Sequence, residues 1–125
     1  MKIAVTIIRI LMGLMFLFAS VAYFLNLFDE PVMTGSIKVF NDGIKASIYL
    51  MPLVKVFELL CAIAFISGFF VPLAAVVIFP ITVNILMFHA FLDAKGLPMA
   101  IILIAANLFI AYYYRNKYKS ILTAR

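Results

Sequence analysis

The sequence predicts an all-α integral membrane protein whose four transmembrane helices pack as an antiparallel bundle. Of its 125 residues, 68% are hydrophobic and only 12% are charged. Soluble chains average about 45–50% apolar and about 25% charged residues, and a soluble domain of this length has too little interior to bury so much apolar surface. The apolar residues also fall into four runs, each close to the roughly 20 residues that a helix needs to cross a bilayer.

We expect one membrane domain over residues 1–125, with the first helix retained as part of it. The first apolar run follows Lys2 as in a secretory signal peptide, but it contains Arg9 and lacks a convincing small-x-small cleavage site. The second run has Pro52 in its opening turns, and the third starts at Pro72, a residue that suits the first turn of a helix. The four helices are expected at about 3–28, 47–70, 72–92 and 97–114.

Two of the three connections are very short. Residues 67–71 lead directly from the second helix into the third, and residues 93–96, Asp-Ala-Lys-Gly, join the third helix to the fourth. Helices joined by such short connections lie next to each other and run in opposite directions. This predicts the antiparallel order of the last three helices.

The first connection is longer and forms an outer loop over residues 29–46. Within it, apolar residues recur at helical spacing against charged ones, which is typical of a short helix lying in the membrane interface. An ordinary polar loop is the alternative that this pattern leaves open. The apolar residues are Ile37, Phe40 and Ile44, and the charged ones are Lys38, Asp42 and Lys45.

Uncompensated positive charge is concentrated at the two ends of the chain. Lys2 precedes the first helix, and the basic tail 115–125 follows the fourth, whereas the two loops expected on the other side mix both signs. By the positive-inside rule, both termini are expected on the cytoplasmic side of the cell (inner) membrane. Basic residues beside a membrane helix meet anionic lipid headgroups, so the net charge of +5 does not indicate nucleic-acid binding.

The sequence contains no motif of a known catalytic or metal site. Cys61 is the only cysteine, which excludes an internal disulfide and a Cys-x-x-Cys pair, and we expect it to be a small buried apolar residue. His89 is the only histidine, which leaves too few ligands for zinc or for a haem held from both sides. There is also no glycine-rich phosphate loop and no nucleophile elbow.

Small and polar residues form one stripe on the first helix and another on the fourth. Such stripes mark the faces through which membrane helices pack on each other, so we expect both to point inward. The first stripe is Arg9, Gly13, Phe16, Ser20 and Tyr23, and the second is Gly96, Ala100, Leu103, Asn107, Ala111 and Tyr114.

Polar side chains within the apolar runs are the candidate functional residues, because ionisable groups in hydrocarbon are costly and usually mark a site. Glu58 and Asn107 lie near the middle of their helices, and Asn84 lies slightly to the outer side of the middle of its helix. Arg9 lies roughly 9 Å from the inner end of the first helix, and its long side chain is able to reach a carboxylate near the midplane. We therefore expect Arg9 and Glu58 to pair, with the two asparagines completing their hydrogen bonds.

A second polar group, of Lys55, His89, Asp93 and Lys95, is expected near the outer interface. On the third helix, His89 lies about 140° around the axis from Asn84 at 100° per residue. We therefore expect the two groups to remain separate rather than to line one cavity.

Each of these residues also has a structural interpretation. For Glu58 it is an ion pair that fixes helix packing, and for His89 it is an interfacial side chain capped by Asp93. Arg9 and Lys55 are long enough to extend to the nearer headgroups instead. Asparagines in membrane helices often serve only to hold helices together.

Four segments of the chain carry a family resemblance: the opening around Arg9, residues 55–74, residues 84–92 (Asn-Ile-Leu-Met-Phe-His-Ala-Phe-Leu), and residues 107–118. Together they resemble the DoxX-like family of small membrane proteins. The resemblance implies a four-helix membrane bundle and functional positions at Arg9, Glu58, Asn84 and His89. The chain departs from the family near the outer end of the first helix, where it has Tyr23 and Asn26 in place of an expected lysine.

The resemblance also implies a range of functions, because members are linked to quinone-coupled sulfur oxidation, membrane redox complexes and assembly. We expect an accessory or assembly module that binds a quinone- or lipid-like ligand in the bundle interior, through Arg9, Glu58, Asn84, His89 and Asn107. The alternatives are a membrane subunit of a quinone-linked oxidoreductase and, third, a small transporter. Expected partners are the lipid bilayer, another membrane protein or redox complex, and a second copy of the chain; catalysis is left open.

Overall fold

The computed structural model describes residues 2–27 and 32–122. Within this part of the chain, four helices are long and apolar enough to cross a membrane. They are α1 (Lys2–Leu25), α3 (Leu50–Ser67), α4 (Val71–Phe91) and α5 (Leu97–Tyr113), with the short 3-10 helix η1 (Ala94–Gly96) leading into α5. The predicted all-α architecture of four membrane-spanning helices is confirmed.

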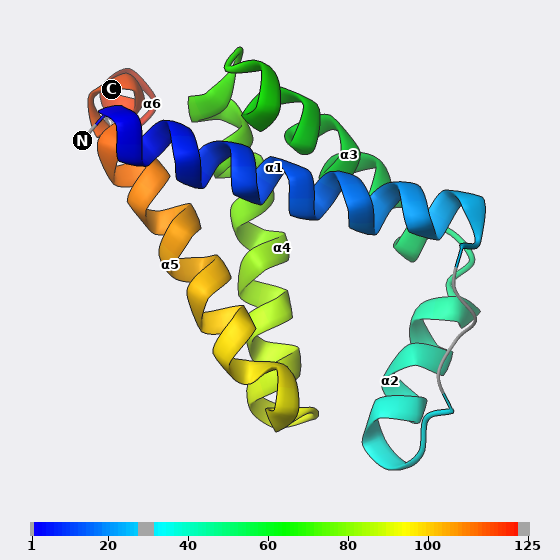
Figure 1. The fold of residues 1–125 in the computed structure, drawn as a ribbon. Helices are drawn as coiled ribbons and strands as arrows, with labels where there is room; N and C mark the ends of the chain where they lie inside the picture. Colours follow the sequence, from blue (N-terminus) through cyan, green and yellow to red (C-terminus); the bar gives the residue numbers. More distant parts are fainter. Residues whose placement is uncertain (1, 28–31, 123–125) are drawn as a thin grey trace.

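The four long helices pack as two closely fitted pairs. α1 lies mainly on α3, α4 lies mainly on α5, and contacts of α3 with α4 and of α1 with α5 join the pairs. Figure 1 shows α1 crossing the ends of α4 and α5 at a steep angle, with the two chain ends near each other. The strong tilt of α1 leaves the far ends of α4 and α5 uncovered by it, and a cavity walled by α2, α3 and this part of α4 is found there.

The contact between α1 and α3 depends on a glycine. A Cβ at Gly13 would lie 2.7 Å from Cγ1 of Ile66 and 3.1 Å from the carbonyl oxygen of Ala62, closer than real side chains approach. Phe16 and Ser20 on the same face are also buried, which confirms the inward stripe predicted for the central part of this helix. Small residues let membrane helices approach closely in this way.

The contact between α4 and α5 contains a buried amide with hydrogen bonds at both its oxygen and its nitrogen. Asn107 donates from Nδ2 to the carbonyl oxygen of Ala75 at 3.1 Å, and its Oδ1 accepts from the hydroxyl of Thr82 at 2.8 Å. Ala100 and Leu103 are buried on the same face of α5. The predicted inward stripe of the fourth helix is thus confirmed at these positions, and Asn107 holds two helices together.

Two of the spanning helices, α1 and α3, are shorter than the apolar runs that predict them. α1 ends at Leu25 rather than near residue 28, and α3 begins at Leu50 rather than near residue 47. α3 stops at Ser67 because Gly68 adopts a φ of +85°, a left-handed conformation that glycine takes without strain. Hydropathy extends beyond these turns and therefore does not locate them. Phe28, Asp29, Glu30, Pro31 and Arg125 lie outside the described residues.

The pattern within residues 29–46 forms a helix, α2 (Gly35–Ala46), rather than an ordinary loop. Its apolar side faces the bundle, where the Phe40 ring packs on that of Phe88 with centroids 5.1 Å apart. On the opposite, exposed side the Lys38 ammonium donates to the Asp42 carboxylate at 2.8 Å, and this hydrogen bond lowers the pKa of Asp42. Figure 1 shows α2 standing beside the bundle rather than within it.

The basic tail is not an extended strand of chain. After α5 it forms the 3-10 helix η2 (Arg115–Tyr118) and a single helical turn, α6 (Lys119–Leu122). The Tyr118 hydroxyl donates to the carbonyl oxygen of Pro72 at 2.7 Å, which ties this segment to the start of α4.

Candidate functional site

The buried carboxylate of Glu58 lies beside a lysine of its own helix. The Lys55 ammonium is 3.1 Å from Oε2 of Glu58, one turn away along α3. Glu58 is only 4% exposed. The expected pairing of Glu58 with Arg9 is therefore wrong: a cation of the same helix neutralises the carboxylate.

Arg9 instead caps the end of α3. Its Nη1 donates to the carbonyl oxygen of Phe65 at 2.9 Å. In a continuing helix this carbonyl would accept from the backbone amide of Phe69, four residues on. That amide instead donates to the Ser67 hydroxyl at 3.3 Å, so the Phe65 carbonyl is open to Arg9. Gly68 leaves the space that the guanidinium fills, since a Cβ there would lie 2.7 Å from Nη1. The Arg9 charge is thus held by a carbonyl at the end of α3 rather than by the Glu58 carboxylate.

One cavity brings together polar residues from both of the groups that the sequence analysis kept apart. It has a volume of about 230 Å³ and is walled by α2, α3 and α4. Asn84 and His89 both line it despite their angular separation, because α2 packs across the end of α4 and closes the space between the two faces. The expectation of two separate groups is therefore wrong. The polar lining residues are Asn41, Lys55, Glu58, Asn84 and His89.

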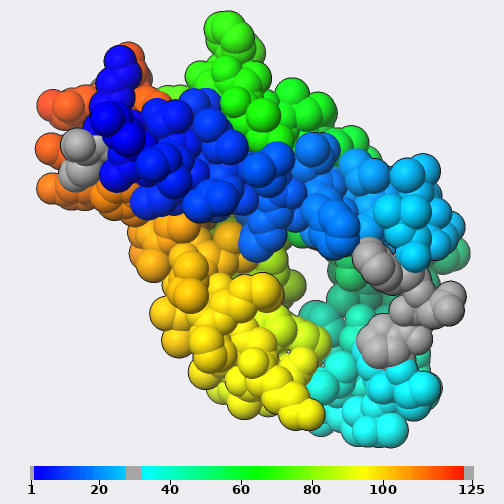
Figure 2. Space-filling model, viewed as in Figure 1, coloured from blue at the N-terminus to red at the C-terminus, as the bar shows by residue number. Residues whose placement is uncertain are grey.

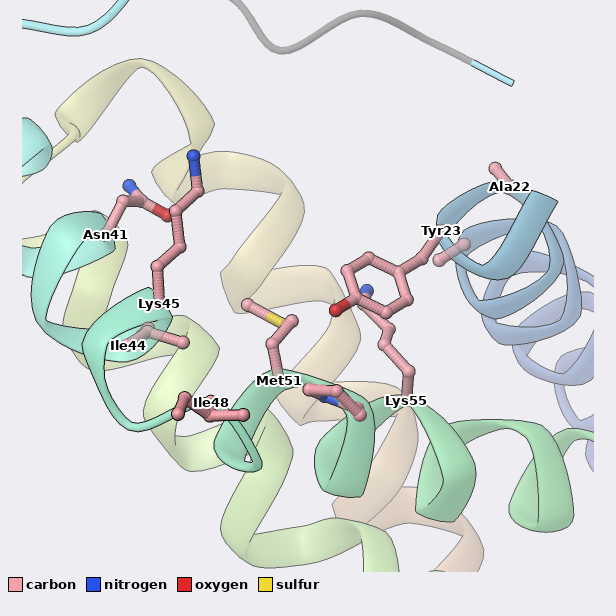
Figure 3. A pocket seen from close by; sticks show the side chains of 10 residues that line it. Ala22, Tyr23, Asn41, Ile44, Lys45, Ile48, Met51 and Lys55 are labelled. Atoms are coloured by element: carbon pink, nitrogen blue, oxygen red, sulfur yellow. The ribbon is translucent and has the colours of Figure 1, made fainter. Parts of the chain in front are cut away.

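A second cavity, of about 410 Å³, adjoins the first and shares Asn41, Ile44, Met51 and Lys55 with it. Figure 3 shows its two walls: Asn41 and Lys45 project from α2, and the Tyr23 ring of α1 points toward Met51 and Lys55 from the other side. In the space-filling view, the molecule is hollowed between α1, α2 and the paired helices α4 and α5 (Figure 2). We call the two spaces together the α2 cavity.

The Glu58 carboxylate has an unmet hydrogen-bonding requirement at the wall of this cavity. Its Oε2 is buried and receives no hydrogen bond from the described residues. The Lys55 ammonium is close enough to neutralise the charge, but it is not oriented as a donor toward Oε2. Buried acceptors in proteins are nearly always satisfied by protein, water or ligand. Glu58 is therefore suited to accept a hydrogen bond from a molecule in the α2 cavity.

His89 is held at the margin of the cavity by the turn between α4 and α5. Its Nδ1 lies 3.1 Å from the carbonyl oxygen of Asp93, and a Cβ on Gly96 would collide with the ring. Because a carbonyl only accepts, we assign the proton to Nδ1, so that Nε2 of the neutral ring is an acceptor. The expected cap by Asp93 thus uses its backbone, since its carboxylate accepts from the Lys95 amide at 3.3 Å.

The remaining predicted site residues lie elsewhere. Arg9, Asn107 and Asp93 do not line the α2 cavity. Asn107 is committed to Thr82 and Ala75, so both its amide oxygen and its amide nitrogen have partners within the bundle. Within residues 2–27 and 32–122, no three His, Cys, Asp or Glu side chains are grouped closely enough to hold a metal ion.

Two lining residues were not singled out from the sequence as site residues. Asn41 lies four residues after Ile37 and donates from Nδ2 to its carbonyl oxygen at 3.0 Å. The sequence signal that could have identified Asn41 is its position, as a polar residue, on the apolar face of α2. Tyr23 was placed on the inward stripe, but it reaches the cavity only because α1 is tilted, which no sequence pattern reports.

Comparison with known proteins identifies one family. A family model described as DoxX matches residues 4–90, which include Arg9, Glu58, Asn84 and His89. No curated protein and no solved structure gives a significant match to the chain.

Proposed function

Because this chain belongs to the DoxX family of membrane proteins, we propose that it binds a quinone- or lipid-like ligand in the α2 cavity and serves as an accessory or assembly module in the cell membrane. The observation that carries the proposal is the buried Oε2 of Glu58, which has no hydrogen-bond donor among the described residues and belongs to a side chain that lines this cavity. A ligand hydroxyl placed there would satisfy it.

The lining of the cavity supports an amphipathic ligand with a ring. Glu58 and Nε2 of His89 offer acceptors, Lys55 offers a donor, and the Asn84 amide offers both. Apolar side chains and the Phe40–Phe88 ring pair make up most of the remaining wall. Ligand pockets commonly combine a mostly apolar lining with a few placed polar groups. Quinol hydroxyls and quinone carbonyls have the matching chemistry.

A membrane subunit of a quinone-linked oxidoreductase is the second candidate. It is favoured by one observation: Glu58 and His89 line the same cavity, and both are groups able to take up a proton. In that case the pair would pass protons while the bound quinone changes its redox state. The two candidates share the site and differ in whether the ligand is converted.

The test is binding of a short-tailed ubiquinol to the purified full chain in detergent, measured by titration calorimetry. A hydrogen bond to a charged group contributes about 1.5–3 kcal/mol and one between neutral groups about 0.5–1.5 kcal/mol, so the exchange of carboxylate for amide in Glu58→Gln is expected to weaken binding about tenfold. Asp42→Asn removes the same charge from the exposed side of α2 and is expected to bind as the natural chain does.

Undiminished binding by Glu58→Gln would overturn the proposed site. Should that variant fail to fold, Asn84→Ala provides the same test from the opposite wall of the cavity. Quinol oxidation followed by absorbance separates the two candidates: turnover with a co-purifying membrane protein favours the oxidoreductase subunit. Binding without turnover, together with a stoichiometric membrane protein in mild detergent, favours the accessory role.

A further inference from the structure

The C-terminal segment builds a groove on the outside of the bundle, far from the α2 cavity. η2 and α6 turn back toward α4 and are fixed there by the hydrogen bond from Tyr118 to Pro72. Burial and the neighbouring Tyr114 raise the pKa of Tyr118, so its hydroxyl stays protonated and continues to donate. The position of the segment is thus defined by a specific contact.

The groove between this segment and the helices has a volume of about 530 Å³ and is almost wholly apolar. Its floor comes from α4 and α5, and Ile121 and Leu122 of α6 form its rim. Leu73, Val76 and Leu108 are exposed within it, so the groove opens away from the bundle. In a bilayer, an open apolar groove along a spanning helix is a place for an acyl chain.

The groove is polar at the end near the C-terminal segment and apolar along the spanning helices. Lys117 is the one charged side chain among its eleven lining residues, and it lies beyond the end of α5 with Tyr118. Phe79 and Leu108 lie further along the spanning helices. A phospholipid has the same order, with its charged headgroup at the interface and its tail in the hydrocarbon.

The charge around the mouth of the groove has one sign. Residues 94–122, the described part of the chain after Asp93, contain no acidic side chain, so no side-chain carboxylate of this part neutralises Lys117. Arg115 is held elsewhere: it lies 4.3 Å from the centre of the Tyr112 ring and donates to the Tyr112 carbonyl oxygen at 3.0 Å. Lys117 is therefore the cation placed to meet a headgroup phosphate.

We propose that this groove is a binding site for an anionic phospholipid, whose phosphate meets Lys117 and whose acyl chain lies between α4, α5 and α6. The site is independent of the α2 cavity, because the two share no lining residue. The lipid fixes the C-terminal segment against the bundle from the membrane side.

The experiment is native mass spectrometry of the full chain, released from mild detergent after addition of phosphatidylglycerol or of phosphatidylcholine with identical acyl chains. One basic residue near a membrane surface contributes about 1 kcal/mol, so phosphatidylglycerol should be retained about fivefold more strongly. Lys117→Gln should abolish this preference. Lys119→Gln removes the same charge from a residue that does not line the groove and should leave the preference unchanged.

Two further measurements distinguish binding in the groove from general attraction of anionic lipid to the basic tail. Val76→Phe fills the groove without a change in charge and should reduce retention of both lipids, and soluble glycerol phosphate should not compete. Equal retention of the two lipids overturns the proposal, as do equal losses in the two lysine variants. Full competition by glycerol phosphate, or unchanged retention by Val76→Phe, also overturns it. If Lys117→Gln changes the structure of the C-terminal segment, the retention measured for Val76→Phe still decides the test.

Discussion

Two basic residues of the membrane-spanning helices meet different electrostatic demands. Lys55 lies beside a carboxylate, whereas Arg9 donates to a backbone carbonyl at a helix end. The planar guanidinium has several donors and suits a cluster of carbonyl oxygens, while an ammonium acts as a compact charge. The family resemblance assigns function to Arg9, but its contacts give it a capping role.

The ion pair of Lys55 and Glu58 should be detectable as coupling between the two residues. Lys55→Met leaves the Glu58 charge buried without a counter-charge and is expected to lower the free energy of unfolding by about 3 kcal/mol. Lys55→Met combined with Glu58→Gln removes both charges and should recover most of that loss. The measurement is unfolding in mixed micelles of increasing denaturing detergent.

Equal destabilisation by the single and the double variant would contradict this, because it would mean that the carboxylate does not depend on Lys55. The comparison also bears on function. A double variant that folds well but no longer binds quinol would show that the pair is needed for the ligand and not only for packing.

At the scale of helices, close packing depends on one glycine of α1. Gly13→Ala places a methyl group against Ile66 and Ala62 and is expected to cost about 1–3 kcal/mol by overpacking. Gly43 of α2 is the matched control, because a Cβ there meets nothing within 4 Å. Gly43→Ala should stabilise α2 by up to about 1 kcal/mol, since glycine lowers helix stability. Thermal unfolding followed by circular dichroism measures both.

A Gly13→Ala variant as stable as the natural chain would contradict the close approach of α1 to α3. A destabilised Gly43→Ala variant would mean that α2 packs against something other than the residues seen here.

The helices themselves were predictable from sequence, and their side-chain contacts were predictable only in part. Four apolar runs suffice to specify spanning helices, because the hydrocarbon leaves a chain little other choice of structure. Local spacing also indicated α2, with an ordinary loop as the open alternative, and identified the stripe through Asn107. The choice between Arg9 and Lys55 as the neighbour of Glu58 depended on the tilt of α1. Hydropathy carries no information on that tilt, so the sequence named Glu58, Asn84 and His89 as candidates without giving the neighbour of Glu58 or the cavity that the three residues line.

At the scale of the whole molecule, the arrangement of charge predicts the orientation in the membrane. Lys2 and the basic residues after α5 are near one another at one end, and α2 is toward the other. By the positive-inside rule, we expect both termini in the cytoplasm and α2 on the outer face. Lys119→Cys should therefore resist a membrane-impermeant maleimide in intact cells, and Ser36→Cys should react. The natural Cys61 is buried and serves as the unreactive background.

Labelling of Lys119→Cys but not of Ser36→Cys would reverse the orientation, and labelling of both would contradict the three crossings, by α3, α4 and α5, that separate the two residues. Treatment of permeabilised cells provides the control that each introduced thiol is reactive once reached.

The hollow beside α2 determines how a ligand would arrive. α2 meets the rest of the molecule chiefly through α3 and through the ring of Phe88, and it stands apart from the long helices. A hydrophobic molecule already dissolved among the lipids would reach the cavity sideways, without first partitioning into water. Occupancy would then follow the mole fraction of that molecule in the membrane rather than its aqueous concentration. A modest intrinsic affinity would be enough to keep the cavity filled.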